Sequence, residues 1–500
     1  MTDAPRLIPR FFRHAVDDAP TKVWLLADDR TWTYAEALQQ IECAASWFRA
    51  HRIVAGDRVL VTARNTADYL LTWLALMEVG AIQVPINPAS SNAEIAGFVV
   101  QVDPKLVVTD AVLESMFTTG TAMVSVGDLF TAARDGRGPV DVDPDDVAVM
   151  IPTSGTTGRS KLVMQTHRAY VMAGEGFPYW MQLTSDDRLM TSLPLFHINA
   201  PAYSTLGSVA ARASLVLLPG FSASTIIDSS RRYGATEFNS IGAMLEILMR
   251  QPARPDDADN PLRLCYTGPS PDRERQQEIE RRFGIELVCG YALSESPYGL
   301  IWRHGTRPFG TLGSVRQHPT LGHVNDARLH EVDPEGVGEL ELRNPVIMRG
   351  YYEMPDETAA VVVDGWLRTG DLVRANDDDT FTFVGRQKEV IRRRGENLSP
   401  TEVQAVLEQH PDVAEAAVIG VPSDLSEEDV KAFVTPLSGH TIDIAALDAF
   451  ARGRLARFKV PRYYEVVAAL PHTPTGRLAK HQLSAERTTA ETDTAKVTPS

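Results

Sequence analysis

The chain has 500 residues, which is long enough for several domains. Hydrophobic residues make up 44% and charged residues 23%, a composition typical of globular proteins. Its formal net charge of -16 argues against nucleic acid or an anionic membrane as the main partner. Residues 1–20 lack the apolar core of a signal peptide, and no apolar run is long enough to span a bilayer. The three cysteines, Cys43, Cys265 and Cys289, have no metal-ligand spacing, so we expect a cytoplasmic protein.

Strands and helices alternate along the first 150 residues. Apolar periodicity predicts helices over residues 32–49 and 67–79, and strands over residues 59–62, 106–109 and 122–126. This alternation favours a layered α/β fold with a parallel sheet.

A buried strand over residues 147–151 leads into a loop rich in glycine and hydroxyl groups. Glycines let the backbone approach a ligand, while N–H groups, hydroxyls and a lysine bind phosphate oxygens. The lysine lies three residues beyond the last glycine, so this is not the Walker pattern. We therefore predict a different polyphosphate-binding loop, made by Thr153, Ser154, Gly155, Thr156, Thr157, Gly158 and Lys161.

This loop resembles the S-G-T-T-G-x-P-K-G loop of the adenylate-forming superfamily, which includes acyl-CoA synthetases, adenylation domains of peptide synthetases, and luciferases. Ser160 replaces the proline and Leu162 the second glycine, which leaves the core of the motif intact. The resemblance implies a large N-terminal layered α/β domain with a small, mobile, mixed α/β C-terminal domain. It also implies ATP or AMP, coenzyme A and Mg²⁺ as cofactors, and a carboxylic acid as substrate.

The segment Leu193–Ala200 resembles the L-P-L-F-H-x-N/x-A motif of acyl-CoA synthetases. A lone histidine among apolar residues is more often part of a core, but the motif favours a place for His197 beside the carboxylate of the acid. Adenylation domains of peptide synthetases usually have Phe-Asp at this position, so Phe196-His197 argues against activation of an amino acid. The resemblance implies an acid pocket made by His197, Asn199, Ile241, Gly242, Ala292 and Pro297.

Two later strand ends resemble the family's nucleotide site. The first, Gly268, Pro269 and Ser270, matches a small-residue loop that packs against adenine, although an ordinary turn is an equal alternative. The second begins at Gly290 and resembles G-Y-G-x-T-E, with Ala292 in place of the glycine. The resemblance implies that Tyr291 stacks on adenine, Ser294 contacts phosphate and Glu295 holds magnesium, a cation that prefers carboxylate oxygens.

The string Thr369-Gly370-Asp371 resembles a family motif, and the resemblance implies a ribose contact by Asp371. It also implies a second ribose or phosphate contact by Arg386, which follows a predicted hairpin that turns at residues 376–379. The family's hinge residue corresponds to Lys388. We expect an adenylate-binding domain over 1–386, a mobile domain over 387–484, and a disordered tail over 485–500, which is poor in apolar residues.

The mobile domain carries two further segments of interest. The loop containing Arg393, Arg394, Gly395 and Glu396 resembles the one that lines the family's pantetheine tunnel, although a solvated basic loop is an equal alternative. The family's adenylation lysine, in P-x-T-x-x-G-K, is replaced by Arg477. Charge is kept, but a planar guanidinium differs in shape from a compact ammonium. The implied catalytic residues are Arg477, His197, Glu295 and Lys388.

Two versions of the function follow. In one, the chain is a complete ATP-dependent acyl-CoA synthetase that tolerates arginine. In the other, which we favour, adenylation is impaired and the chain forms thioesters from acyl-AMP that a separate enzyme supplies. Loading of a carrier protein, a luciferase-like oxygenase and a non-catalytic binding protein are alternatives. The sequence leaves the acid and the oligomeric state open, a homodimer included.

Overall fold

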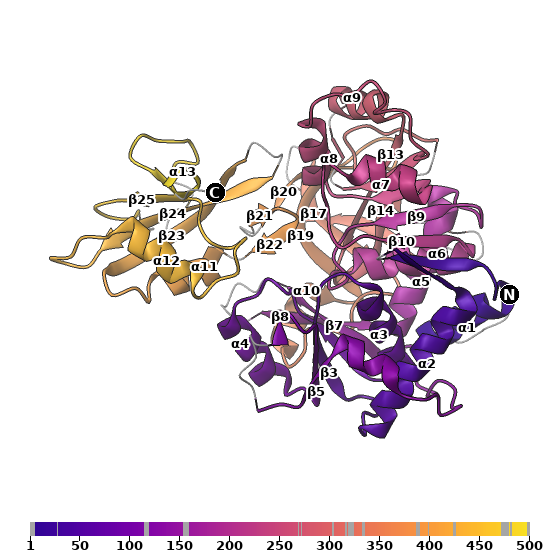
Figure 1. Cartoon of the computed structure of the whole chain (residues 1–500). Helices are drawn as coiled ribbons and strands as arrows, with labels where there is room; N and C mark the ends of the chain where they lie inside the picture. The colour runs from indigo at the N-terminus through magenta and orange to yellow at the C-terminus, as the bar shows by residue number, and fades with distance from the viewer. Residues whose placement is uncertain are drawn as a thin grey trace. The chain divides into compact units, whose positions relative to one another are not determined.

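The computed structural model describes residues 6–27, 29–114, 120–153, 160–268, 270–271, 273–302, 305–315, 318, 325–332, 336–386, 391–398, 400–423, 427–471, 480 and 483–497, without the side chains of 242, 243, 384–386, 397, 401, 496 and 497. Within these residues the chain forms two compact units (Figure 1). Unit 1 comprises Met1–Pro88, Val102–Pro152 and Leu162–Gln387, and unit 2 comprises Ala89–Gln101, Thr153–Lys161 and Lys388–Ser500.

The largest sheet of unit 1 has nine strands among the described residues. In sheet order they are β15 (Ser314–Val315), β14 (Ser296–Ile301), β13 (Glu286–Leu293), β12 (Leu264–Thr267), β11 (Glu237–Asn239), β9 (Arg188–Thr191), β10 (Ser214–Leu217), β1 (Val23–Ala27) and β2 (Arg30–Thr33). The strands from β13 to β1 run parallel, and β2, β14 and β15 are antiparallel to their neighbours. The parallel strands β9 to β12 are short and almost wholly buried, because helices cover both faces of the sheet.

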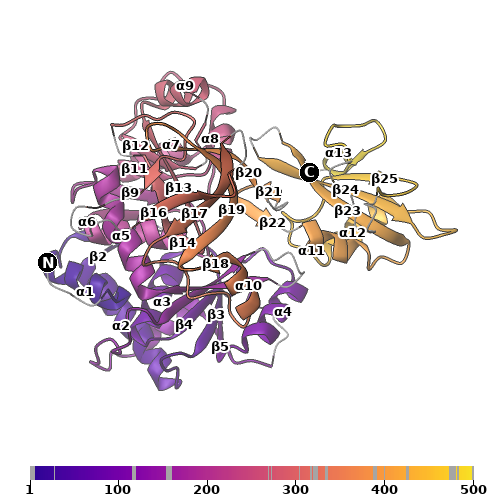
Figure 2. The ribbon, with the colours of Figure 1, turned by 180° about the vertical axis from the view of Figure 1, so that it is seen from behind.

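Helices α7 (Ile226–Tyr233), α8 (Gly242–Met249) and α9 (Arg273–Phe283) pack on one face through a core that includes Phe238 and Ile279. Helix α5 (His167–Met181) belongs to the core on the other face (Figure 2). That core also contains α1 (Ile8–Asp18), the short π-helix η3 (Ala200–Thr205) and α6 (Leu206–Ala211).

A second sheet has, in order, β6 (Met123–Ser125), β5 (Leu106–Thr109), β3 (Arg58–Thr62), β4 (Ile82–Pro85), β7 (Val147–Thr153) and β8 (Lys161–Thr166). Helices α2 (Tyr34–Ala50) and α3 (Ala67–Glu78) share one core with this sheet and with the nine-stranded sheet. Because α3 is apolar on nearly every face, it is buried along nearly its whole length. Helix α2 begins with a capping box between Thr33 and Glu36, which explains why the Trp32–Glu36 segment starts a helix.

The third sheet of unit 1 is antiparallel. It contains β16 (Asp326–His330), β17 (Val337–Arg343), β19 (Trp366–Ala375), β18 (Val362–Val363), and β20 (Phe381–Arg386), which pairs with β19. The pairing of β19 with β20 confirms the hairpin predicted to turn at residues 376–379. Helix α10 (Pro355–Val361) precedes β18.

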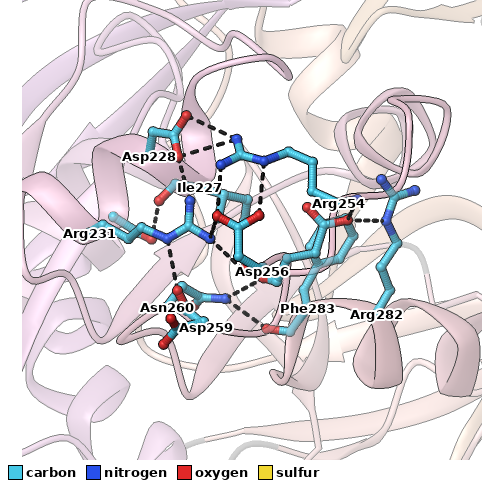
Figure 3. Close-up of polar contacts among 11 residues, drawn as sticks. Ile227, Asp228, Arg231, Arg254, Asp256, Asp259, Asn260, Arg282 and Phe283 are labelled. Carbon is cyan, nitrogen blue, oxygen red and sulfur yellow. Dashed lines mark hydrogen bonds and ion pairs between the residues drawn. The ribbon is translucent and has the colours of Figure 1, made fainter.

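A network of arginines and carboxylates holds the connection between α8 and β12 (Figure 3). Arg254 pairs with Asp228 of α7 at 3.1 Å and with Asp256 at 2.8 Å, and Arg282 of α9 pairs with Asp257 at 2.8 Å. The exposed Arg254 pairs contribute little stability individually, but together with the more buried Arg282–Asp257 pair they fix the loop from which β12 starts. The network therefore positions a strand whose opposite end leads to predicted site residues.

Unit 2 contains the hairpin β21 (Ile391–Arg393) and β22 (Glu396–Leu398), and a sheet in the order β23 (Val413–Pro422), β24 (Glu428–Pro436), β25 (Tyr463–Val466) and β26 (Thr492–Asp493). Its helices are α11 (Pro400–Leu407), α12 (Ile444–Arg452), α13 (Thr494–Val497) and most of α4 (Asn92–Val102). Within the described residues, no helix has the length and apolarity needed to cross a lipid bilayer.

The end of the chain differs from the disordered tail that its composition predicts. β26 pairs antiparallel with β25, and helix α13 follows it directly. The acidic residues that make this segment look solvated are ion-pair partners: Glu491 contacts Lys431 at 3.0 Å and Asp493 contacts Arg462 at 3.3 Å. Composition alone does not reveal that the complementary cations lie on neighbouring strands.

Glu237 in β11 gives a test of the core. Its side chain is 0% exposed, and burial raises its pKa well above the ordinary value. A carboxyl group with a raised pKa in the folded state contributes stability below its unfolded pKa, and this stability is lost as the pH rises through the folded pKa. Glu237→Gln should therefore raise the melting temperature at pH 8 by at least about 2 °C and by less at pH 5.

Calorimetry or thermal circular dichroism at both pH values would measure the effect. Glu274→Gln, the same change at an exposed site, is the control. An equal response of the two variants at pH 8 would contradict the assignment of Glu237 as a buried neutral carboxyl group.

Candidate active site

Most of the predicted acid and nucleotide residues lie at or beyond the carboxyl ends of four adjacent parallel strands, β9, β11, β12 and β13. In open parallel sheets, ligands bind at this edge because successive loops emerge there together. The loops and strand ends contribute His197 and Asn199 after β9, Ile241 and Gly242 after β11, Gly268 and Ser270 after β12, and Gly290, Tyr291 and Ala292 within β13.

Two glycines lie where neighbouring strand ends approach closely. A Cβ atom on Gly268 would lie 2.7 Å from the carbonyl oxygen of Gly290, and one on Gly290 would lie 2.5 Å from the hydroxyl oxygen of Tyr266. A side chain at Gly268 would push the two strands apart, and one at Gly290 would displace the buried Tyr266 ring, so both positions favour glycine. The packing of adenine against Gly268 and Ser270 stays a prediction.

Asp371 and Tyr291 form a direct contact. The Tyr291 hydroxyl donates a hydrogen bond to Asp371 Oδ2 at 2.6 Å, and Asp371 is 1% exposed. Asp371 also lies directly opposite Arg386 in the β19–β20 register. The structure thus brings together Tyr291, Asp371 and the backbone of Arg386, three of the residues predicted to contact the nucleoside.

Glu295 lies in the turn between β13 and β14, where Tyr351 orients its carboxylate. The Tyr351 hydroxyl donates to Glu295 Oε1 at 2.9 Å, and burial together with the Glu295 charge raises the pKa of Tyr351, so the phenol stays a donor. Gln165 of β8 donates to the carbonyl oxygen of Ser294 at 2.6 Å. One oriented carboxylate fits Mg²⁺, which proteins commonly hold by one or two carboxylates together with substrate phosphates.

Backbone pairing with β8 places Tyr351. Met164 N donates to Gly350 O at 3.0 Å, and Arg349 N donates to Met164 O at 2.9 Å, so residues 349–352 lie antiparallel to β8. The sequence analysis assigns no contact to Tyr351, because nothing in the string Arg349-Gly350-Tyr351 identifies Glu295 as its partner.

The predicted phosphate loop joins β7 to β8. Its described ends are close together, with the Thr153 hydroxyl donating to Lys161 O at 3.5 Å. The strand–loop–strand arrangement matches the buried strand and the loop that the sequence predicts, and β8 begins at Lys161. The remaining predicted residues of this loop, Ser154, Gly155, Thr156, Thr157 and Gly158, lie outside the described residues, as do Pro269, Lys388 and Arg477.

The predicted acid pocket contains a polar residue that sequence reasoning missed. Asn239, at the carboxyl end of β11 and 0% exposed, donates from Nδ2 to Asn199 Oδ1 at 2.6 Å. The His197 ring lies against Phe196 with centroids 4.6 Å apart, and Pro297 O accepts from Tyr203 at 2.6 Å. The sequence feature that could have indicated Asn239 as a site residue is its position as an asparagine at the end of a buried strand.

The β21–β22 hairpin changes one predicted role. Arg393 is buried: its Nε donates to Asp429 at 3.0 Å, and its Nη1 donates to Phe458 O and Val460 O at 3.1 and 2.6 Å. These internal contacts make Arg393 a structural residue rather than the predicted CoA contact. Arg394 and Gly395 form the turn, both with positive φ, and Arg394 is exposed, while Glu396 starts β22.

These features define an enzyme that binds a nucleotide at the edge of a parallel sheet, with a carboxylate suited to a phosphate-bound cation. The comparisons identify its family. The sequence model of the family described as AMP-binding enzyme matches residues 12–352. The model of the AMP-binding enzyme C-terminal domain matches residues 402–477. The chain belongs to this adenylate-forming family.

Curated relatives include crotonobetaine/carnitine–CoA ligases of Salmonella heidelberg (strain SL476) and Proteus mirabilis (strain HI4320). Each is 31% identical, and each alignment covers 91% of this chain and 93% of the relative. With the family match, these relatives show that the chain is an acid–thiol ligase, an acyl-CoA ligase that uses ATP, CoA and Mg²⁺.

Solved structures show the same fold. An o-succinylbenzoate CoA synthetase double mutant from Bacillus subtilis, bound to a product analogue, superposes with a TM-score of 0.87 at 24% identity, covering 96% of this chain and 99% of that one. The amide bond synthetase McbA from Marinactinospora thermotolerans superposes with a TM-score of 0.84 at 25% identity, covering 94% and 98%.

Removing the hydroxyl of Tyr351 tests the Glu295 site. In Tyr351→Phe the carboxylate loses the donor that orients it, and a hydrogen bond to a charged group contributes about 1.5–3 kcal/mol. Because water can partly replace the donor, we expect MgATP to bind about tenfold more weakly, as measured by isothermal titration calorimetry.

Tyr352→Phe removes a hydroxyl from the next residue and is the matched control. Wild-type affinity in both variants would show that Tyr351 does not orient a magnesium-binding carboxylate.

Proposed function

We propose that this acyl-CoA ligase acts mainly in the second half-reaction, forming a thioester from acyl-AMP and CoA, and that its adenylation step is weak. The observation that carries the proposal is Arg477, which stands where the family's adenylation lysine is expected. The proposed partner is a separate enzyme that supplies acyl-AMP.

The physical reason lies in the first half-reaction. A carboxylate attacks the α-phosphate of ATP, so two anions must be brought together by cations placed between them. A flexible ammonium fits such a gap, whereas a guanidinium is a wider planar fork. Losing one well-placed charge typically lowers a rate by about 10²–10³.

Thioester formation does not need that cation. The CoA thiol attacks the carbonyl carbon of acyl-AMP, and AMP is a good leaving group. In the proposed cycle the small domain rotates about Lys388 between the half-reactions and takes residue 477 away from the site. The division of the chain into units at Lys388 supports this hinge position.

Features of unit 1 support retention of an acyl-AMP site. Asp371 is buried and bonded to Tyr291, as expected of a ribose contact beside an adenine contact. Gly268 and Gly290 keep adjoining strand ends free of side chains. We propose that His197 lies beside the acyl carboxylate and that Asn199 and Asn239 make part of the acid pocket polar.

A complete ATP-dependent synthetase is the second candidate. It is favoured by the 31% identity to relatives named as CoA ligases and by Glu295, whose carboxylate has an orienting donor. In this version Arg477 supports adenylation without loss.

Pyrophosphate release separates the two candidates. Wild type and Arg477→Lys are given ATP, Mg²⁺ and a panel of acids that includes carnitine, crotonobetaine and o-succinylbenzoate. We expect the lysine variant to release pyrophosphate about 10²-fold faster than wild type, because the compact ammonium restores the clamp. Arg452→Lys, on the surface of the same unit, is the control and should match wild type. Equal rates for wild type and Arg477→Lys would establish the complete synthetase instead.

A further inference from the structure

The carboxyl-terminal segment forms an integral part of the sheet in unit 2. β26 pairs with β25 with Tyr463 opposite Asp493, and Thr494 donates to Arg462 O from its N–H at 2.9 Å and from its hydroxyl at 3.1 Å. This segment lies beyond residue 477, where the family match ends. It is therefore an addition to the part of the small domain that the family model covers.

The carboxyl-terminal segment supplies a carboxylate, that of Glu491, to the buried ammonium group of Lys431. Lys431 of β24 is 0% exposed, and its Nζ lies 2.9 Å from Glu465 and 3.0 Å from Glu491. The same ammonium donates to the Glu486 carbonyl at 3.2 Å. Removing one partner of a buried ion pair leaves an uncompensated charge, so the segment is held by more than its short strand.

A second set of ion pairs runs from this segment to the predicted CoA hairpin. Asp493 pairs with Arg462 at 3.3 Å, Arg462 pairs with Asp429 at 2.7 Å, and Asp429 pairs with Arg393 at 3.0 Å. The side chains of Asp429, Asp493 and Arg393 are all nearly buried, so water screens these interactions little. Negative and positive side chains therefore alternate in this series of contacts from Asp493 to Arg393.

Arg393 directly precedes the turn made by Arg394 and Gly395. The turn is held from its other side as well, because Gly395 N donates to the Glu427 carboxylate at 3.0 Å. Asp429 and Glu427 lie at or beside the start of β24, so the conformation of the turn depends on where these two carboxylates are held. Arg462 shares Asp429 with Arg393 and is itself held by Asp493.

We propose that the carboxyl-terminal segment, residues 484–497, is a positioning element for CoA, acting through Asp493, Arg462, Asp429 and Arg393 on the Arg394–Gly395 turn. This inference rests on the proposed thioester-forming function for the use of CoA, and on the sequence-based prediction that CoA lies beside that turn. Asp493 and Arg462 are positioning residues, since they act on the turn through Arg393.

The test compares Asp493→Asn with wild type in the full chain. Hydrogen exchange followed by mass spectrometry reports the hairpin directly, and we expect faster exchange in residues 391–398. CoA affinity, measured by calorimetry with an acyl-sulfamoyl adenosine bound, should fall about fivefold, within the range typical of coupling through a contact network. Affinity for the acyl-sulfamoyl adenosine itself should stay within twofold of wild type.

Asp412→Asn removes a half-buried carboxylate that pairs with His440 at 2.7 Å in the same unit, and it is the matched control. Asp493→Glu keeps the charge and should restore most of the CoA affinity. If Asp493→Asn does not fold, Arg462→Lys, which keeps one charge but cannot bridge two carboxylates as a fork, is measured in the same way and carries the same expectation.

Unchanged CoA affinity in the variant that folds would overturn the proposal, whether or not hairpin exchange or the melting temperature changes. These measurements need no turnover, so their outcome is separate from that of the pyrophosphate experiment. If wild type adenylates rapidly, the proposed specialisation in the second half-reaction is wrong. The proposed role of the carboxyl-terminal segment in CoA binding is then still decided by the CoA affinities alone.

Discussion

The hydrogen bond from Tyr351 to Glu295 is the contact on which the rest of the site depends. It joins the turn between β13 and β14 to a segment that pairs with β8, and β8 begins at the last residue of the predicted phosphate loop. Gln165 reinforces the junction from β8 to the carbonyl of Ser294. A carboxylate near polyphosphate is useful only if its direction is fixed, and here a buried phenol with a raised pKa fixes it.

The interior of unit 2 is organised by ion pairs. Its interior contains cations that are neutralised by carboxylates from separate strands, with Lys431 and Arg393 as the most buried examples. Pairs of this kind add little net stability over apolar packing, but breaking one is costly, so they specify geometry. A domain proposed to present different faces to one site needs such internal rigidity, because its segments must keep their positions while the whole unit moves.

The buried strand that leads into the phosphate loop, the β19–β20 hairpin and the strand ends at Gly268 and Gly290 were predictable, since each is encoded by a local pattern of apolar runs, glycines and hydroxyls. The buried role of Arg393, the Asn239–Asn199 contact and the ordered carboxyl-terminal strand were not. Each depends on a partner at least 28 residues away in sequence, and local composition contains no information about such a partner. The acidic segment near Asp493 looked solvated because its cations lie on other strands.

The central claim is that thioester formation is the retained half-reaction, and a single-turnover comparison tests it most directly. Wild type is mixed with CoA and either synthetic acyl-AMP or the same acid with ATP and Mg²⁺, and acyl-CoA is quantified by mass spectrometry over time. We predict that acyl-AMP yields thioester at least about 10²-fold faster than acid and ATP. Equal rates from the two starting points would contradict the account.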